Sequence, residues 1–373
     1  MASNTNNHPL PTRNNCVTLT STLVLTSLLA LTVQVFYFSP IDPLLFEPTP
    51  SVSSSKNNQL QNLIKLGEGF LKQPEDVCVD KEGIIYTATR DGWIKRLVLR
   101  NGKWENWKHI DSSSLLGITT SKDGGLIVCD ATMGLLKVTE EDGFSVILSQ
   151  VNGSQLLFAD DVIEASDGSI YFSVASTKFG LHSWHLDVLE ARPHGKLLKY
   201  NPMLNETVVV LDDLAFANGV ALSKDEDYVV VCESWKFRCV RHWLKGINKG
   251  KTDIFIENLP GGPDNINLAP DGSFWIALVQ LLASERLGFV YTSKVSKHLV
   301  ASFPRLFNLI NGATKSAMVV NVGAEGNIIR KFGDNEGKVV SFLTSAVEFE
   351  DHLYLGSLNT DFVGKFPLLS SAN

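Results

Sequence analysis

Short apolar segments rich in β-branched residues alternate with polar turns through most of the chain. From about residue 59 onward one unit recurs, made of an apolar run, a turn rich in Asp and Gly, and a second apolar run. Paired runs of this length around such a turn are typical of β-hairpins. We identify six of them: VCVDKEGIIYTA, ITTSKDGGLIVCD, VIEASDGSIYFSV, VALSKDEDYVVVC, INLAPDGSFWIAL and AVEFEDHLYLGS, with turns at Gly83, Gly125, Gly168, Glu226, Gly272 and His352.

The spacing of these hairpins predicts an all-β fold, a six-bladed β-propeller over residues 59–370. Six units over roughly 310 residues give about 52 residues each, near the length of a propeller blade. A second strand pair, as in WIKRLVLRNGKWENW, supplies the outer half of a four-stranded blade. We interpret VVNVGAEGNIIRKFG, with its turn at Gly326, as the outer hairpin of the fifth blade. The alternative is a seven-bladed ring with one very short blade.

A long uncharged segment precedes the repeat. No charge lies between Arg13 and Asp42, and Val17–Phe38 is long enough to cross a bilayer as a helix. We predict one transmembrane helix, a signal-anchor at residues 17–39, whose Ser and Thr hydroxyls bond back to the preceding turn. The alternative is a cleaved signal peptide, but its apolar region is usually about 7–15 residues long and is followed by small residues. Here Gln34–Phe38 follows instead.

The charges beside this segment predict its orientation. Arg13 precedes the span, whereas Asp42 and Glu47 follow it, so residues 1–16 should be a short cytosolic tail and the rest should be lumenal. The compartment would be one of the secretory pathway, the endoplasmic reticulum or the vacuole. Residues 40–58, which combine Pro and Ser, are predicted to be a linker. The sequons at Asn152 and Asn205 suit glycosylation of a lumenal domain.

Composition and charge exclude several classes of function. The chain is 44% hydrophobic and 20% charged, which suits a packed core and excludes a disordered chain. Its net charge of −7, with no basic block, argues against nucleic acid as a partner. There is no P-loop, G-x-G-x-x-G, G-x-S-x-G or H-E-x-x-H motif.

The five cysteines have no C-x-x-C spacing for zinc. Cys232 and Cys239 would face each other across a two-residue turn, Trp235-Lys236. We interpret them as two buried thiols, with a cross-strand disulfide as the alternative.

Oxygen-bearing side chains recur at one phase of the repeat. Each lies just before the first strand of its unit, where the innermost strands of a propeller meet the central channel. Counting back eight residues from each turn gives Glu75, Gly117, Asp160, Asn218, Asp264 and Thr344.

Three carboxylates in one narrow channel would raise one another's pKa unless a cation lay between them. Because all the donors are hard oxygens, we predict a single channel cation, Ca²⁺, bound by Glu75, Asp160, Asn218 and Asp264. The alternative is that these Asp and Asn residues only form turns at the starts of strands.

Several segments resemble those of the strictosidine-synthase-like family. They are EARPHGKLLKYNP, FANGVALSKDEDYVVVCESW, RCVRHWLKG and GGPDNI, and the similarity extends from about residue 60 to residue 367. The resemblance implies a six-bladed propeller, often with an N-terminal anchor in the secretory pathway. The true synthase joins an amine to an aldehyde in a Pictet–Spengler reaction that uses a catalytic Glu in the last blade. The position that matches this Glu here is Thr344, which cannot supply the carboxylate for proton transfer.

The wider superfamily includes gluconolactonase, regucalcin and paraoxonase propellers, which bind calcium in the channel and hydrolyse esters or lactones. The resemblance to them assigns metal ligation to Glu75, Asn218 and Asp264, with Asp160 in the place of a further ligand. It also suggests Asp264 and Asn265 as general base and substrate contact.

Two histidines of the long insertion in the third blade, His182 and His185, are further candidates for a general base. A surface or packing role is the preferred interpretation for them. We therefore predict a metal-dependent hydrolase of small-molecule esters or lactones. A Pictet–Spengler synthase, disfavoured by Thr344, and a non-catalytic binding propeller are the alternatives.

Overall fold

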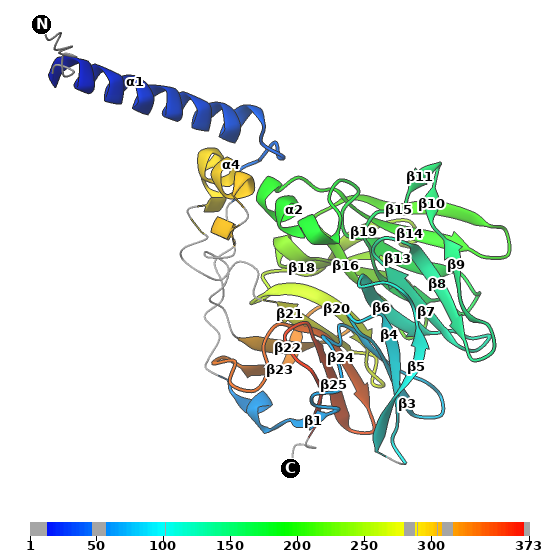
Figure 1. Ribbon diagram of the computed structural model, residues 1–373. Coiled ribbons are helices and arrows are strands. Elements are labelled where there is room, and N and C mark those ends of the chain that lie inside the picture. Colours follow the sequence, from blue (N-terminus) through cyan, green and yellow to red (C-terminus); the bar gives the residue numbers. More distant parts are fainter. Residues whose placement is uncertain are drawn as a thin grey trace, which may run out of the picture.

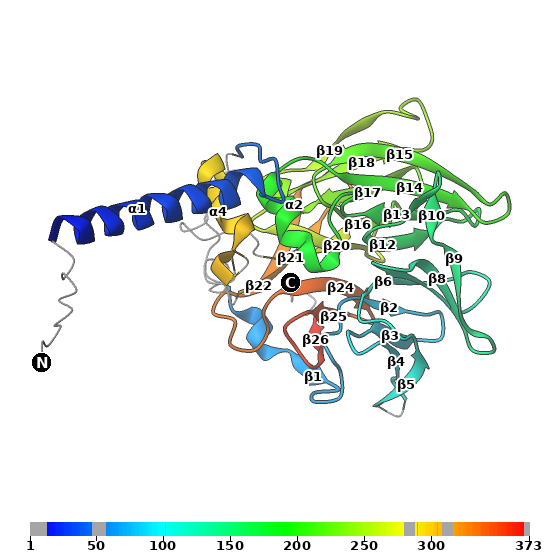
Figure 2. The same cartoon turned by 45° about the horizontal axis from the view of Figure 1, so that its top comes forward.

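The chain folds into a ring of antiparallel sheets with one long helix projecting from it (Figure 1). The computed structural model describes residues 13–46, 57–100, 102–279, 288, 290–303, 305–307 and 316–368. Within these ranges six four-stranded sheets surround a central channel as the blades of a propeller (Figure 2). The predicted six-bladed fold is confirmed, and the seven-bladed alternative is wrong.

Each of the first five blades is a meander of four consecutive strands, counted from the channel outward. Blade 1 contains β2 (Val77–Val79), β3 (Ile84–Ala88), β4 (Trp93–Val98) and β5 (Lys103–His109). Blade 2 contains β6 (Leu115–Thr120), β7 (Leu126–Asp130), β8 (Gly134–Thr139) and β9 (Gly143–Leu148). Blade 3 contains β12 (Ala159–Glu164), β13 (Ile170–Val174), β14 (Gly195–Asn201) and β15 (Glu206–Leu214). Blade 4 contains β16 (Ala217–Leu222), β17 (Tyr228–Glu233), β18 (Arg238–Trp243) and β19 (Thr252–Ile256). Blade 5 contains β20 (Gly262–Leu268), β21 (Phe274–Val279), β22 (Ala317–Val322) and β23 (Ile328–Asp334).

The sixth blade closes the ring with strands from both ends of the propeller. Its inner strands are β24 (Leu343–Phe349), β25 (His352–Ser357) and β26 (Val363–Pro367), and its outermost strand is β1 (Ile64–Leu66). In the pairing of β1 with β26, Ile64 lies opposite Lys365 and Leu66 opposite Val363. The backbone of β26 is therefore paired on both sides, and the start of the propeller is fastened to its end.

The six predicted hairpins are the two innermost strands of the six blades. The segment around Gly326 connects β22 to β23 and so forms the outer half of blade 5, as predicted. Burial follows position in the blade. All of β7 and β17 is buried, whereas exposed and half-buried residues dominate β5. Inner strands are covered on both faces by neighbouring blades, which explains their uninterrupted apolar runs.

The projecting helix is α1 (Arg13–Thr32), which continues as the π-helical turn η1 (Val33–Tyr37). Val17–Tyr37 is apolar and long enough to cross a membrane. The hydroxyls of Thr22, Thr26 and Thr32 donate to carbonyl oxygens four residues earlier, at 2.8–2.9 Å, so these side chains are satisfied within the helix.

The remaining elements are short. They are the 3₁₀ turns η2 (Gln59–Asn62), η3 (Leu181–Ser183) and η4 (Ser234–Lys236), the helices α2 (Trp184–Glu190) and α4 (Lys294–Ser302), and the ribbon of β10 (Gln150–Val151) and β11 (Ser154–Gln155). The helix α2 lies within the insertion of blade 3, and α4 lies between β21 and β22 of blade 5.

The predicted linker at residues 40–58 is bound to the propeller at both of its described ends. The Leu44 amide donates to the Glu190 carbonyl at 2.8 Å, and the Asn57 side-chain amide donates to the Lys331 carbonyl at 2.9 Å. Residues 47–56 lie outside the described ranges. Residues 40–46 of the predicted linker therefore have a defined position, because their backbone groups find partners on the propeller.

Two buried aspartates join neighbouring blades at the channel. Asp76 accepts hydrogen bonds from its neighbour Val77 and from the Ile118 amide of blade 2, each at 2.8 Å. Asp161 does the same with Val162 and with the Val220 amide of blade 4, each at 2.7 Å. Each carboxylate thus satisfies two backbone N–H groups that the strand bulges leave free.

We expect Asp161→Ala to destabilise the ring, because it leaves two buried N–H groups without acceptors at about 1–3 kcal/mol each. The thermal midpoint of the detergent-solubilised full-length protein should fall by at least about 4 °C. Asp225→Ala, at an exposed turn position of blade 4, is the matched control and should change stability by less than about 0.5 kcal/mol. Equal midpoints for the two variants would contradict the blade-joining role.

Candidate metal and active site

A cavity of about 600 Å³ lies at one end of the channel. The residues at its wall come from all six blades and from the insertion that carries α2, which crosses this end of the ring (Figure 2). They are Gln73, Glu75, Arg90, Ser113, Leu116, Phe158, Asp160, Leu181, His182, Trp184, Phe216, Asn218, Ser234, Asp264, Val279, Phe342, Leu358 and Asn359. The cavity wall thus combines a cluster of polar and charged side chains with eight apolar ones.

All four predicted metal ligands line this cavity. Glu75 precedes β2. Asp160, Asn218 and Asp264 lie at the second or third residue of strands β12, β16 and β20. In the last three strands the register shifts between the residues that flank the site, so a bulge places one side chain toward the channel and the next one back into the blade. All four residues are 3–7% exposed.

In blade 2 the residue equivalent to these ligands is Leu116. The prediction of Gly117 at this position is wrong by one residue. The turn between β6 and β7 contains two glycines, and Gly124 rather than Gly125 donates back to the first residue of the turn, as Gly168 does in blade 3. Counting back eight residues from Gly124 gives Leu116, which lines the cavity. A Cβ at Gly117 would lie 2.6 Å from Asp161 Oδ1, so this position has room only for glycine.

The cluster is strongly anionic and buried. Burial, and then the charges of Asp264, Asp76 and Asp160, raise the pKa of Glu75 well above its usual value. Burial and then the charge of Asp160 likewise raise the pKa of Asp264. Burial raises the pKa of Asp160 to about 7. The protein therefore holds three carboxyl groups where their ionised forms are costly.

Arg90, which sequence reasoning missed, is the cation that faces these groups. It lines the cavity and lowers the pKa of Glu75, Asp160 and Asp264, while burial lowers its own pKa. One guanidinium opposite three ionised carboxylates leaves a formal excess of two negative charges. Arg90 lies in the loop after β3, outside the phase of the repeat that identified the ligands, so internal spacing carried no signal for it.

The donor chemistry of the cluster fits a hard divalent cation. Glu75 Oε2, Asp160 Oδ2 and Asn218 Oδ1 are buried, and none of them has a hydrogen-bond partner. Such oxygens are costly unless something positive contacts them. No three His, Cys, Asp or Glu side chains in the described ranges form a ready-made metal group. The match to Ca²⁺ therefore rests on the unpartnered oxygens and their hardness rather than on a preformed carboxylate cage.

The other predicted catalytic residues divide between the cavity and its surroundings. His182 lines the cavity. His185 does not, because its ring packs against Phe307 with centroids 5.0 Å apart. Asn265 lies behind the wall, where its side-chain amide donates to Glu75 Oε1 at 3.2 Å. Asn265 therefore positions Glu75 and does not contact the cavity, contrary to its predicted role as a substrate contact.

Thr344 is fully buried, and its hydroxyl donates to the Glu75 carbonyl oxygen at 2.5 Å. It contributes nothing to the cavity wall. Its place in the sequence, equivalent to the catalytic Glu of the synthase, is thus used for a backbone contact that fixes the segment carrying Glu75.

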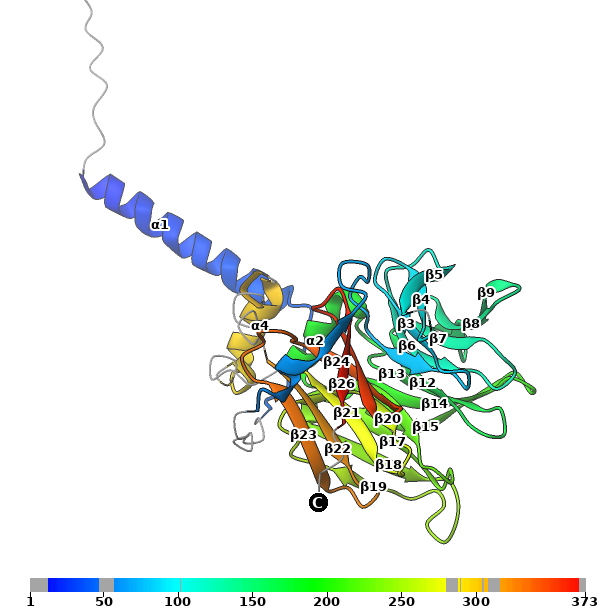
Figure 3. The same ribbon diagram turned by 90° about the horizontal axis from the view of Figure 1, so that it is seen from below.

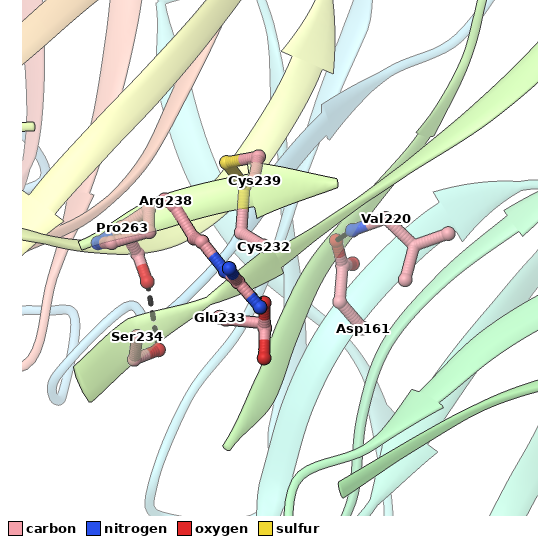
Figure 4. The surroundings of a disulfide bond; sticks show 8 residues. All are labelled: Asp161, Val220, Cys232, Glu233, Ser234, Arg238, Cys239 and Pro263. Carbon is pink, nitrogen blue, oxygen red and sulfur yellow. Dashed lines mark hydrogen bonds and ion pairs between the residues drawn. A yellow bond between two sulfur atoms is a disulfide. The ribbon is translucent and has the colours of Figure 1, made fainter. Parts of the chain in front are cut away.

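Cys232 and Cys239 form a disulfide, which corrects the prediction of two free thiols (Figure 4). They are directly opposite each other in β17 and β18, with Cα atoms 3.9 Å apart. Four residues connect the two strands, not two as predicted. Ser234 in this connection lines the cavity and donates to the Pro263 carbonyl at 2.8 Å, so the disulfide links the two strands whose connection reaches the site (Figure 4).

Asn152 and Asn205, the predicted glycan acceptors, are both exposed and lie in turns with left-handed backbone conformation. Their positions leave room for a glycan, and their modification stays a prediction.

We expect the stability of the chelator-treated protein to fall as pH rises from about 4 to about 7. In the folded protein the pKa of Asp160 is about 7, whereas the unfolded chain has the ordinary value near 3.9, so folding retains a proton over this interval. Asp160→Asn removes the titration of this one group, whereas Glu75 and Asp264, whose pKa values are also raised, still titrate. The thermal midpoint of this variant should exceed that of the wild type at pH 8, with a smaller difference at pH 4.5. A constant difference at both pH values would refute the assigned pKa.

Comparisons with known proteins agree with this geometry. Residues 160–247 match the family model described as strictosidine synthase, and residues 55–97 match the model described as strictosidine synthase-like, N-terminal. STRICTOSIDINE SYNTHASE-LIKE 4 of Arabidopsis thaliana is 32% identical over 337 residues, which cover 88% of each chain. Adipocyte plasma membrane-associated protein of Mus musculus is 31% identical over 356 residues, covering 89% of this chain and 85% of that one.

Two solved structures share the fold at low sequence identity. A gluconolactonase from Xanthomonas campestris superposes with a TM-score of 0.59 at 13% identity, covering 82% of this chain and 89% of that one. A calcium-binding regucalcin from Agrobacterium tumefaciens has a TM-score of 0.54 at 13% identity, covering 79% and 90%. The identity and coverage of the sequence relatives show that the chain belongs to the strictosidine-synthase-like family.

Proposed function

We propose that the propeller is a metal-dependent hydrolase of small-molecule esters or lactones. The observation that carries the proposal is the set of three unpartnered buried oxygens, Glu75 Oε2, Asp160 Oδ2 and Asn218 Oδ1, at a cavity that also has apolar side chains on its wall. A gluconolactonase and a calcium-binding regucalcin among the proteins of the same fold support the choice of chemistry and of cation.

Glu75, Asp160, Asn218 and Asp264 would hold Ca²⁺. When bound, a divalent cation supplies polarisation of a carbonyl and acidification of an attacking water. Arg90, on the cavity wall, offers positive charge to the oxygen that becomes negative as water adds to the carbonyl carbon. Phe158, Phe216 and other apolar wall residues bind the carbon skeleton of the substrate and exclude bulk water.

Asp264 is the group we assign to proton transfer. Its carboxyl group lines the cavity among the proposed ligands, where it can accept a proton from a water in the same cavity. It takes the proton from the attacking water as the new C–O bond forms. It then returns that proton to the leaving oxygen as the ester or lactone C–O bond breaks, which gives an acid and an alcohol. His182, in η3 on the cavity wall, is the second candidate for this role.

The synthase alternative finds no support at its diagnostic position, because Thr344 carries no carboxylate and lies outside the cavity wall. A binding propeller without catalysis would use the same cavity, so activity must separate the two. We also propose that α1 anchors the protein as a single-pass membrane protein with its propeller in the lumen of the secretory pathway.

The hydrolase proposal predicts turnover on a panel of aryl esters and lactones that is lost in chelator and restored by Ca²⁺. Asp264→Ala should lower kcat/KM by roughly 10²-fold or more, the usual effect of removing an acid–base group. Asp225→Ala is the control and should keep full activity. Ca²⁺ should also raise the thermal midpoint of the wild type but not that of Glu75→Gln. A fully active Asp264→Ala protein would sink the assigned role, and stabilisation without any turnover would favour the binding propeller.

The proposed topology predicts that the propeller is glycosylated when the protein passes through the secretory pathway of a cell. Treatment with an endoglycosidase should shift the mobility of the wild type on a gel, and Asn152→Gln and Asn205→Gln should each remove one step of the shift. The double variant should show none. An unglycosylated wild type that is digested by protease added outside intact microsomes would place the propeller in the cytosol.

A further inference from the structure

The end of α1 is fixed to the propeller by the segment Ser39–Phe46. The Asp42 amide donates to Glu190 Oε1 at 2.7 Å, and Arg192 donates to the Asp42 carbonyl at 2.8 Å and to its carboxylate at 2.6 Å. The Phe46 amide donates to the Tyr291 carbonyl at 3.1 Å. Hydrogen bonds along the whole segment hold it at a defined position on the propeller face.

The helix α4 lies beside the last turns of this anchor (Figures 1 and 3). The ring of His298 contacts the ring of Phe36 with centroids 5.4 Å apart, and its Nδ1 lies 2.7 Å from Ser39 Oγ. Lys297 donates to the Leu44 carbonyl. These contacts place α4 at the level where the apolar run of α1 ends.

The outer face of α4 is apolar and uncovered by the described part of the chain. Val295, Leu299 and Phe303 follow one another at intervals of four residues and are 52%, 36% and 39% exposed. Val295 and Leu299 are four residues apart within α4 and so lie on one side of the helix. Phe303 is the capping residue directly after the helix and adds a third exposed apolar side chain at its end, and together the three form a stripe. The opposite side, with Val300 and Ala301, packs into a cluster with Ile41 and Leu189.

We propose that the stripe Val295, Leu299 and Phe303 is immersed in the interface of the bilayer that α1 crosses. Because α4 contacts η1, which continues α1, we propose the bilayer rather than another protein as the partner that covers this stripe. The helix that carries the stripe contacts η1 through His298 and Phe36. Phe36, Tyr37 and Phe38 are exposed aromatic side chains at the end of the span, where aromatic residues favour the boundary between lipid and water. An amphipathic helix in that position buries its apolar face among the upper acyl chains. Lys294, exposed at the start of α4, can reach the lipid head groups.

This placement would hold the cavity close to the lipid surface. The helix α2 packs against α4, with Trp184 in contact with Phe307, and Trp184 also lines the cavity. Resting on the proposed function, the inference therefore specifies esters or lactones that partition into membranes as the substrate class. The immersion itself does not depend on catalysis, so its test uses no activity.

The test places an environment-sensitive fluorophore on single cysteines of the full-length protein in phosphatidylcholine nanodiscs. The background carries Cys16→Ser, while Cys78 and Cys129 are buried and Cys232 and Cys239 are disulfide-bonded. Probes at Val295→Cys and Leu299→Cys should show blue-shifted emission and should lose emission to lipids that carry a quencher high on the acyl chain, more than to lipids quenched near the bilayer centre.

Two matched positions calibrate the result. A probe at Leu25→Cys, on the exposed surface of α1, should respond most to the deep quencher. A probe at Ile247→Cys, a 95% exposed apolar residue between β18 and β19, should respond to neither. If both α4 probes behave like the probe at 247 while the probe at 25 is quenched, the proposal is overturned. Loss of quenching at 25 also overturns it, because α1 would then not cross the bilayer. Quenching at 295 and 299 without hydrolysis of any ester would retain the membrane face and reject the proposed function.

Discussion

Buried negative charge around the channel is the constraint on which the rest of this propeller depends. Ionised carboxylates in a low-dielectric ring are costly unless each finds compensation. Asp76 and Asp161 find it in backbone N–H groups of their own and the adjoining blade. The carboxyl groups that face the cavity have Arg90 as their facing cation and the side-chain amide of Asn265 as a donor to Glu75, yet Glu75 and Asp160 each retain an unpartnered oxygen. The inner aspartates therefore serve the fold, whereas the outer ring of oxygens is left available for a ligand.

The β-bulges at the starts of the inner strands explain how much of the site could be predicted from the sequence. Each inner strand starts with a pair of residues of which one points to the channel, so the ligands recur at a constant distance from the turn and the period was readable. The count missed the cavity wall in two blades. In blade 2, Gly124 and Gly125 both suit a turn and just one occupies the equivalent place. In blade 6 the count selects Thr344, which is buried against the Glu75 backbone instead of lining the cavity. Side chains at other positions of the repeat do not recur from blade to blade, so their role could not be predicted from internal spacing. Arg90, the contact between Thr344 and Glu75, and the pairing of β1 with β26 depend on long-range packing and emerged only from the structure.

The EARPHG segment, conspicuous in the sequence, has a physical role that its position on a loop did not suggest. Glu190 is fully buried, where Lys178 and His194 contact its carboxylate at 2.6 Å each. It also accepts the Asp42 amide, and Arg192 binds Asp42 from the other side. The EARPHG segment therefore binds the residues that follow α1, through the contacts of Glu190 and Arg192 with Asp42. The predicted linker could not be recognised as bound, since its Pro and Ser residues have the composition of a flexible connection.

A series of contacts connects the segment that follows α1 to the cavity wall. Phe46, at the end of the bound segment, packs edge-on against Trp235 with ring centroids 5.4 Å apart. Trp235 donates to the buried Asp187 of α2 at 3.2 Å and follows Ser234, which lines the cavity. The disulfide fixes the two strands that carry this turn. Because packed side chains move together or not at all, the orientation of the anchor constrains α2 and the cavity wall. If α1 crosses a bilayer as proposed, the contacts of Phe46 and α4 would transmit the position of that bilayer to the cavity wall. A chain cut between α1 and the propeller would then lose this restraint even if the ring stayed closed.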